Sequence, residues 1–238
     1  MKIARFPAVL GERDTVHVHD DFFWYVTAHQ WTSLAADITP TLTVGDAVNG
    51  VLALFTDTTD NNEVAVRTTA ELFKFGTGRH IYGRCKLQYA ENDTNKANVF
   101  AGFGSAIGAN FLVDNGAGPR TSGDILGIFK VDGGTVWKCI SQTNGTAVTS
   151  TSTTTAGGTA AQVLEIDCVD SDDGVNMIAT FKVDGIPLKD STTGLPIKHT
   201  VLIASATEMN GGVYVKTGGG AGGETVNVDA IDLIQTRV

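Results

Sequence analysis

Long hydrophobic runs are missing from this sequence. Nowhere do about 18 apolar residues follow one another, as a membrane-spanning helix requires. The first residues, M-K-I-A-R-F-P-A-V-L-G-E-R-D, contain an apolar stretch that Arg5 and Pro7 interrupt and that is too short for a signal peptide. We therefore expect a soluble protein with no membrane partner, made in the cytoplasm.

Cysteine is scarce, and the few cysteines do not form a recognisable pattern. Cys85, Cys139 and Cys168 are an odd number, contain no C-x-x-C pair and each lie within an apolar-alternating segment. This arrangement favours free buried thiols over a disulfide framework or a zinc site. We expect no cofactor.

Positive charge is also in short supply. The chain has 17 Lys and Arg against 26 Asp and Glu, a formal net charge of −9, and the charges are scattered rather than clustered. Phosphate binding needs clustered Lys and Arg, so nucleic acid is not an expected partner.

Alternating strands are what the sequence does contain, most clearly over 163–189. Apolar and polar residues alternate through V-L-E-I-D-C-V and M-I-A-T-F-K-V, on either side of the acidic turn D-S-D-D-G. Successive side chains of a strand point to opposite faces, so each of these two strands has one apolar face and one face exposed to solvent. Asp184-Gly185 then favours a tight turn into a third short strand.

Similar turn signals occur through the rest of the chain, where clusters of Gly, Asn, Asp and Pro separate short apolar-alternating segments. Asp132-Gly133-Gly134 is a second strong hairpin signal. The pattern predicts an all-β antiparallel sandwich or barrel, with an N-terminal arm over residues 1–19 and one domain over residues 20–238. Candidate strands are Gly50–Phe55, Val64–Thr68, Ile81–Tyr89, Asn98–Ser105, Asp124–Val131, Val136–Ser141, Val163–Val169, Met177–Val183, Val201–Ala206, Gly212–Lys216 and Thr225–Gln235.

Two segments break this rhythm. Ser141 to Ala161 is almost wholly Ser, Thr, Gly, Ala, Asn and Gln, which is typical of a long loop or of a polar edge hairpin. Residues 106–123 place an apolar patch inside a glycine-rich connection, and a monomer would have to cover that patch.

The acidic residues of the late strands invite a catalytic interpretation. Glu165, Asp167 and Asp170 resemble the E-x-D-x-x-E strand of a β-jelly-roll glycoside hydrolase family, in which carboxylates on one strand face act as nucleophile and general acid. Asp170 departs from that pattern because its side chain is one methylene shorter than glutamate. The alternative is that Glu165 and Asp167 are the solvent side of a strand, which is the default in an antiparallel sheet.

Metal and nucleophile signatures are weaker. The D-S-D-D-G turn does not have the spacing of a twelve-residue calcium loop, and His17-x-His19 lacks a third well-placed ligand. There is no G-x-S-x-G, H-E-x-x-H or G-x-x-x-x-G-K motif. We therefore expect no metal site, no catalytic residue and no enzymatic activity.

Several loose motifs together resemble a known group of proteins. They are D-D-F-F-W-Y-V-T, W-T-S-L-A-A-D, G-G-T-V-W-K, T-T-T-A-G-G-T, F-K-V-D-G-I-P-L, P-I-K-H-T, S-A-T-E-M and G-V-Y-V-K-T-G-G, spread over residues 20–238. In this combination the chain resembles structural proteins of tailed bacteriophages that decorate or cement the capsid. The resemblance implies a concanavalin-A-like jelly roll on the outer capsid surface of the virion, made in the host cytoplasm, bound to the major capsid protein and commonly a homotrimer.

The N-terminal arm is our candidate for the contact with a neighbouring subunit. Phe6, Val9 and Leu10 could order on that contact, and the alternative is a disordered tail.

A second function class is a carbohydrate-binding, lectin-like module, which would stack sugar rings on aromatic side chains. This interpretation requires at least two exposed, coplanar aromatic residues on one sheet face, so the exposure of Trp24, Trp31 and Trp137 decides it. A third interpretation, a glycosidase built on Glu165 and Asp167, requires an open cleft over their strand.

Overall fold

A computed structural model describes residues 14–26, 29–35, 41–45, 50–91, 94–157, 160–219 and 222–236 of the 238-residue chain. These residues form eighteen strands, sixteen in two packed sheets and two in a small separate hairpin, and they contain no α-helix. Every strand pairing among them is antiparallel. The prediction of an all-β antiparallel sandwich is confirmed. Within the described residues there is also no helix long and apolar enough to cross a membrane.

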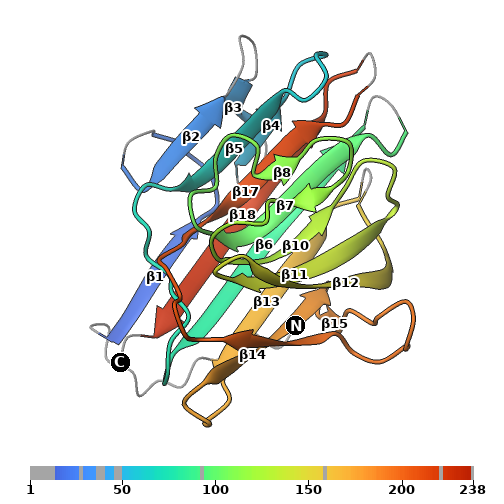
Figure 1. Ribbon diagram of the computed structural model, residues 1–238. Helices are drawn as coiled ribbons and strands as arrows, with labels where there is room; N and C mark the ends of the chain where they lie inside the picture. Colours follow the sequence, from blue (N-terminus) through green and yellow to red (C-terminus); the bar gives the residue numbers. More distant parts are fainter. Residues whose placement is uncertain are drawn as a thin grey trace.

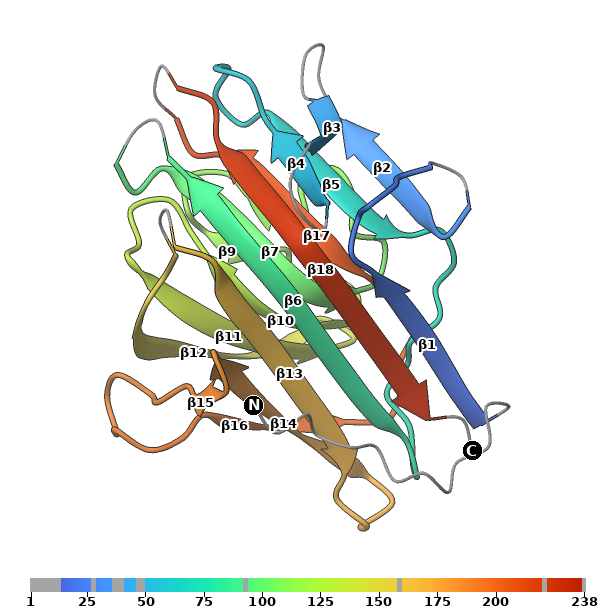
Figure 2. The ribbon, with the colours of Figure 1, turned by 180° about the vertical axis from the view of Figure 1, so that it is seen from behind.

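The first sheet, sheet A, has nine strands and carries both ends of the described chain (Figure 2). Its main path runs β15 (Ile186–Pro187), β14 (Asn176–Val183), β13 (Gln162–Asp170), β6 (His80–Ala90), β18 (Thr225–Thr236), β4 (Val51–Phe55) and β3 (Thr41–Gly45). In addition, β1 (Thr15–Asp20) pairs with β18, and β16 (Lys198–Leu202) pairs with β14.

The second sheet, sheet B, has seven strands and lies against sheet A (Figure 1). Its order is β12 (Thr146–Thr155), β11 (Val136–Thr143), β10 (Ile125–Lys130), β7 (Ala97–Gly104), β17 (Asn210–Thr217), β5 (Glu63–Thr68) and β2 (Trp31–Ala35). A small hairpin of β8 (Leu112–Val113) and β9 (Gly118–Pro119) lies outside both sheets.

All of strand β1 except Asp20 lies within the segment 1–19, for which the sequence pattern predicts an arm. Thr15 is opposite Thr236 and Asp20 is opposite Ile231, so the last five residues of that segment belong to sheet A. The predicted contact residues Phe6, Val9 and Leu10 lie outside the described residues.

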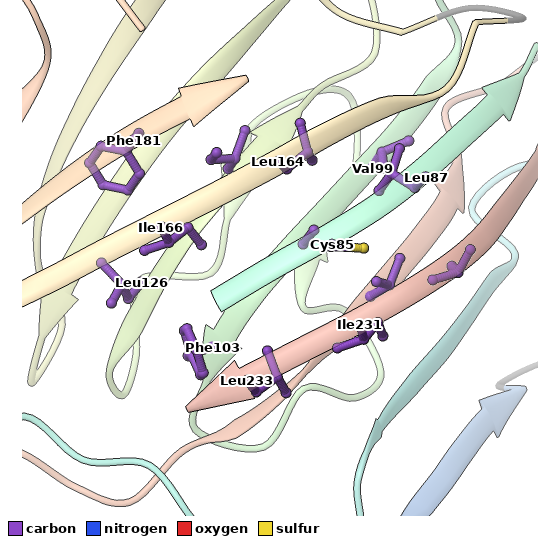
Figure 3. Packing of buried hydrophobic residues seen from close by; sticks show 14 of the residues in the cluster. Cys85, Leu87, Val99, Phe103, Leu126, Leu164, Ile166, Phe181, Ile231 and Leu233 are labelled. Atoms are coloured by element: carbon purple, nitrogen blue, oxygen red, sulfur yellow. The ribbon is translucent and has the colours of Figure 1, made fainter. Parts of the chain in front are cut away.

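Alternation along the strands builds the core between the two sheets. Leu164 and Ile166 of β13 face inward beside Leu233 of β18, and Phe103 and Leu126 of sheet B reach them from the other side (Figure 3). Cys85, Cys139 and Cys168 are free and buried in the same core, as predicted. Burial raises the pKa of Cys85 to about 12, so this thiol stays protonated and unreactive at neutral pH.

The connection after β7 covers the outer face of sheet B. Ile107, Phe111 and Leu112 are fully buried there, and the Phe111 ring meets Phe100 edge-on at 4.7 Å. Beneath this connection, buried Lys216 donates to the Leu112 carbonyl oxygen at 3.2 Å and to Asn110 Oδ1 at 3.1 Å. The apolar patch predicted over residues 106–123 is therefore covered by the chain's own sheet.

The Ser/Thr-rich segment adopts the second of its two predicted forms, a polar edge hairpin. Strand β12 is the edge of sheet B and pairs with β11 from Thr143–Thr146 to Val136–Thr155. Asn144 and Gly145 both have positive φ, as a two-residue hairpin turn requires.

His199 joins the two sheets near this hairpin. The side chain, 2 % exposed, extends from β16 and lies 3.0 Å from Ser141 Oγ of β11 and 3.0 Å from Ser150 Oγ of β12. Its ring also meets the Phe181 ring edge-on at 5.1 Å. Burial lowers the pKa of His199 to about 4, although the nearby Asp190 carboxylate acts in the opposite direction. The imidazole is therefore neutral in the folded protein at pH 7.

This buried histidine predicts a stability that falls with acidification. In the unfolded chain His199 binds a proton below about pH 6.5, whereas in the folded protein it does so only near pH 4. Between these values the unfolded state binds more protons, so the free energy of unfolding should fall by about 2 kcal/mol from pH 7 to pH 5. Urea unfolding of wild type, His199→Gln and the control His29→Gln, which changes an exposed histidine, measures this. The drop should disappear only in His199→Gln, and equal drops in all three proteins would contradict the assignment.

Candidate functional site

The acidic residues singled out in the sequence lie on the outer face of sheet A. Strand register places Lys182, Glu165, Arg84, Asp232 and His19 in one row across β14, β13, β6, β18 and β1. The charge alternates in sign from Lys182 to Asp232, and opposite charges facing each other across strands stabilise a sheet.

Each carboxylate of the proposed catalytic strand has neighbouring partners. Tyr82 donates its hydroxyl to Glu165 Oε1 at 3.2 Å, and His80 Nε2 lies 2.5 Å from Asp167 Oδ1. Asp170 accepts the backbone N–H group of Asp172 in the hairpin turn and that of Gly78 in the connection before β6. Neither Glu165 nor Asp167 lines the small cavity beside Leu164 and Ile166 or the cavity beside β16. This arrangement favours the alternative in which Glu165 and Asp167 are the solvent side of a strand.

The two candidate metal motifs are also part of the local structure. Asp173 accepts the backbone N–H groups of Val175 and Asn176, and its hydrogen bonds to the Asn176 side chain and to these groups hold the pKa of Asp173 well below its usual range. His17 Nε2 lies 2.7 Å from Asp232 Oδ1. Over the described ranges, no three His, Cys, Asp or Glu side chains gather closely enough to hold a metal ion.

The most exposed aromatic side chains belong to the turn that follows β1. Phe23 is 76 % exposed and Trp24 is 75 % exposed, and Val26 beside them is also exposed. Large aromatic side chains in solvent are typical of binding surfaces, since they offer much contact area and lose little conformational entropy on binding.

This aromatic turn, residues 21–26, is held in place by its buried first aromatic residue. Phe22 has a φ of +50°, is fully buried and lies 5.7 Å from the Trp31 ring. The Asp20 carboxylate accepts the Phe22 N–H at 2.7 Å and the Trp31 indole N–H at 2.6 Å. A Cβ on Gly50 would lie 2.4 Å from the Phe22 carbonyl, so only glycine fits there. Phe22 therefore anchors the turn and leaves Phe23 and Trp24 exposed.

The three tryptophans have different environments. Trp31 and Trp137 are buried, and the Trp137 indole N–H donates to Gln162 Oε1 at 2.8 Å. The lectin interpretation required two exposed aromatic residues on a sheet face, and neither Trp31 nor Trp137 meets that requirement. Trp24 and Phe23 are exposed, but they project from a turn. The run F-F-W-Y-V is the sequence signal for this turn, because it places four consecutive aromatic residues where a strand alternation would allow only every second one inside.

Comparisons with known proteins identify the fold. No family model and no curated protein matches the chain. An endo-1,3-beta-glucanase from Streptomyces sioyaensis is similar in structure, with a TM-score of 0.58, 14 % identity, and coverage of 97 % of this chain and 100 % of that one. The carbohydrate recognition domain of Emp47p has a TM-score of 0.56, 9 % identity and coverage of 96 % and 100 %. The lectin UEA-II complexed with galactose has a TM-score of 0.53, 9 % identity and coverage of 93 % and 98 %.

At these low identities the similarity establishes the fold and no more. The chain has a concanavalin-A-like jelly-roll fold, as predicted.

The environment of Glu165 leads to a prediction about catalysis. We expect neither the wild type nor Glu165→Gln to release reducing ends from a β-1,3-glucan above the buffer background, because the carboxylate belongs to a cross-strand polar row. Glu165→Gln should also change the free energy of unfolding by less than about 0.5 kcal/mol, as is usual for a surface substitution. Hydrolysis by the wild type that is lost in Glu165→Gln would contradict this prediction.

Proposed function

We propose that this protein is a non-catalytic carbohydrate-binding module that uses the aromatic turn, residues 21–26, as its contact surface. The observation that carries the proposal is the pair Phe23 and Trp24, two adjacent aromatic side chains that are about three-quarters exposed on an anchored turn. Aromatic faces stack on the apolar C–H faces of sugar rings, and a fixed turn reduces the entropy lost on binding.

The chemistry around the turn suits a glycan. Asp21, His29 and Gln30 are exposed close by in the chain and offer hydrogen-bonding groups for sugar hydroxyls. Among structures that share this fold are a carbohydrate recognition domain and a galactose-bound lectin, which supports the same class of ligand.

Truncation of the exposed indole tests the proposal. Trp24→Ala should weaken binding to immobilised galactose-terminated and β-1,3-glucan oligosaccharides by about tenfold, which corresponds to about 1.4 kcal/mol. Biolayer interferometry measures the dissociation constants. Ile186→Ala, which truncates a side chain that is 68 % exposed elsewhere on the surface, is the matched control and should bind like the wild type. The proposal is wrong if no oligosaccharide binds the wild type, or if Trp24→Ala and Ile186→Ala bind equally.

The second candidate is a decoration protein on the outer capsid surface of a bacteriophage virion, made in the host cytoplasm. The motifs spread over residues 20–238 support it, as does the exposed aromatic pair, because aromatic residues are enriched at the centres of protein interfaces. Its partners would be the major capsid protein and two further copies of this chain. In a homotrimer each modest contact would gain strength from the effective concentration of the other two.

Co-sedimentation with capsid shells that lack the protein separates the two candidates. A decoration protein should pellet with the shells at a fixed stoichiometry, and an excess of free oligosaccharide should not release it. A protein that stays in the supernatant at micromolar concentration would exclude the decoration role. Sedimentation velocity of the free protein measures the oligomeric state in the same experiment.

A further inference from the structure

A cavity of about 240 Å³ opens beside β16, between the edge of sheet A and the β11–β12 hairpin of sheet B. The hairpin contributes Ser141, Gln142, Thr143, Asn144, Thr146 and Val148, while β16 and the turn after it contribute Thr200, Val201, Leu202, Ala204 and Ser205. Its volume is slightly below the roughly 300–1,000 Å³ of typical small-molecule pockets, which suits a ligand of one ring.

The cavity is rich in uncharged polar groups. Seven of its eleven lining residues carry a hydroxyl or an amide, the other four are aliphatic, and none is Asp, Glu, Lys, Arg or His. A charged ligand would lose its hydration without gaining an ion pair here, which is costly. The lining therefore favours a neutral ligand that has both hydroxyl groups and apolar C–H faces.

One buried hydroxyl of the cavity wall has no partner. Thr143 is 6 % exposed, and its Oγ1 makes no hydrogen bond within the described part of the chain. Unpaired buried polar atoms are uncommon in folded proteins because each costs free energy. Ser141, by comparison, already bonds His199. The Thr143 Oγ1 atom itself has almost no accessible surface, so a ligand in the cavity would reach this unused hydroxyl only after the side chain rotates.

The edge of sheet A adds backbone groups to the same wall. Among the described strands β16 pairs only with β14, and the Ile203 N–H donates to the Val175 carbonyl oxygen at 2.9 Å. Hydrogen-bonded pairs alternate along an antiparallel ladder, so the peptide groups of Thr200 and Leu202 point away from β14. Both residues line the cavity, so their peptide groups lie at its margin.

From these observations we infer a second binding site, in which the cavity beside β16 takes one neutral sugar residue. This inference deepens the proposed carbohydrate-binding function and rests on it. Strands β1 and β16 are separated in sheet A by β14, β13, β6 and β18, which at about 4.8 Å per strand spacing amounts to about 24 Å. The cavity and the aromatic turn after β1 therefore cannot hold the same sugar ring, and a branched glycan would reach both.

Titration of the isotope-labelled full-length protein with free monosaccharides tests the inference. Galactose, glucose and N-acetylglucosamine are the neutral probes, and glucuronate is the charged counterpart. At least one neutral sugar should shift the methyl signals of Val148 and Leu202 with a dissociation constant on the order of 1 mM, the range expected for a ligand of about 12 non-hydrogen atoms. Glucuronate should bind more weakly than glucose.

Three variants localise the binding. Thr143→Val keeps the shape and removes the unpaired hydroxyl, so it should weaken sugar binding about fivefold without loss of stability. Ala204→Trp, on the exposed turn, should block the cavity and abolish the shifts. Thr149→Val, on an exposed position of the same hairpin outside the cavity lining, is the matched control and should bind like the wild type.

The outcomes also separate this inference from the proposed function. The cavity site is wrong if the monosaccharide-induced shifts of Val148 and Leu202 survive in Ala204→Trp, or if no monosaccharide binds the wild type. In either case the proposed function still stands when oligosaccharide binding depends on Trp24. If neither monosaccharides nor oligosaccharides bind the wild type, both the cavity site and the proposed function are wrong. If uncharged peptides rather than sugars shift the amide signals of Thr200 and Leu202, the inference is wrong and the edge of β16 binds a strand.

Discussion

The alternation of side chains along paired antiparallel strands is the constraint on which this structure depends. Because every second residue of β13, β14, β6 and β18 points inward, sheet A delivers one continuous apolar face to sheet B, and Ile166 and Leu233 meet Phe103 between them. The same alternation directs Glu165, Asp167 and Arg84 outward into a shared polar surface. A shift of one residue in any of these pairings would exchange the two sets, so hydrophobic burial also fixes the register.

Polar groups that the sandwich buries are mostly paired, and this limits where ligands can bind. His199 uses both ring nitrogens to connect β16 with β11 and β12, and Lys216 holds the connection that covers sheet B. Asp167 is close to His80 on the outer face of sheet A. The two features proposed to bind ligands lie away from the sheet faces. They are the anchored turn with Phe23 and Trp24 and the cavity beside β16. Neither the side chains of Phe23 and Trp24 nor those that line the cavity carry a charge, in keeping with the neutral ligand proposed above.

Short edge strands and turns were the hardest parts to predict. Val16 and Val18 in β1 and Leu42 and Val44 in β3 do alternate with polar residues, but two apolar residues are too few to identify a strand, and Trp31–Ala35 has no alternation. Pairing with β18, β5 and β4 defines these three strands. The aromatic run at 22–25 shows that the strand alternation stops there. It does not show that Phe22 turns inward with a positive φ, because that depends on Trp31 and Gly50 from other parts of the chain.

The sequence by itself determined the all-β antiparallel class, the long central strands, the hairpins at Asp132-Gly133 and Asp184-Gly185, and the burial of the three cysteines. These features follow from local rules, namely a period of two and the turn preferences of Asp and Gly. Only the tertiary structure decided that Trp31 and Trp137 are buried while Trp24 is exposed, that residues 106–123 cover sheet B, and that Thr143 lines a cavity with an unused hydroxyl. The reason is that exposure and partnership are properties of contacts between segments far apart in the chain, and the spacing of residues along one strand does not encode them.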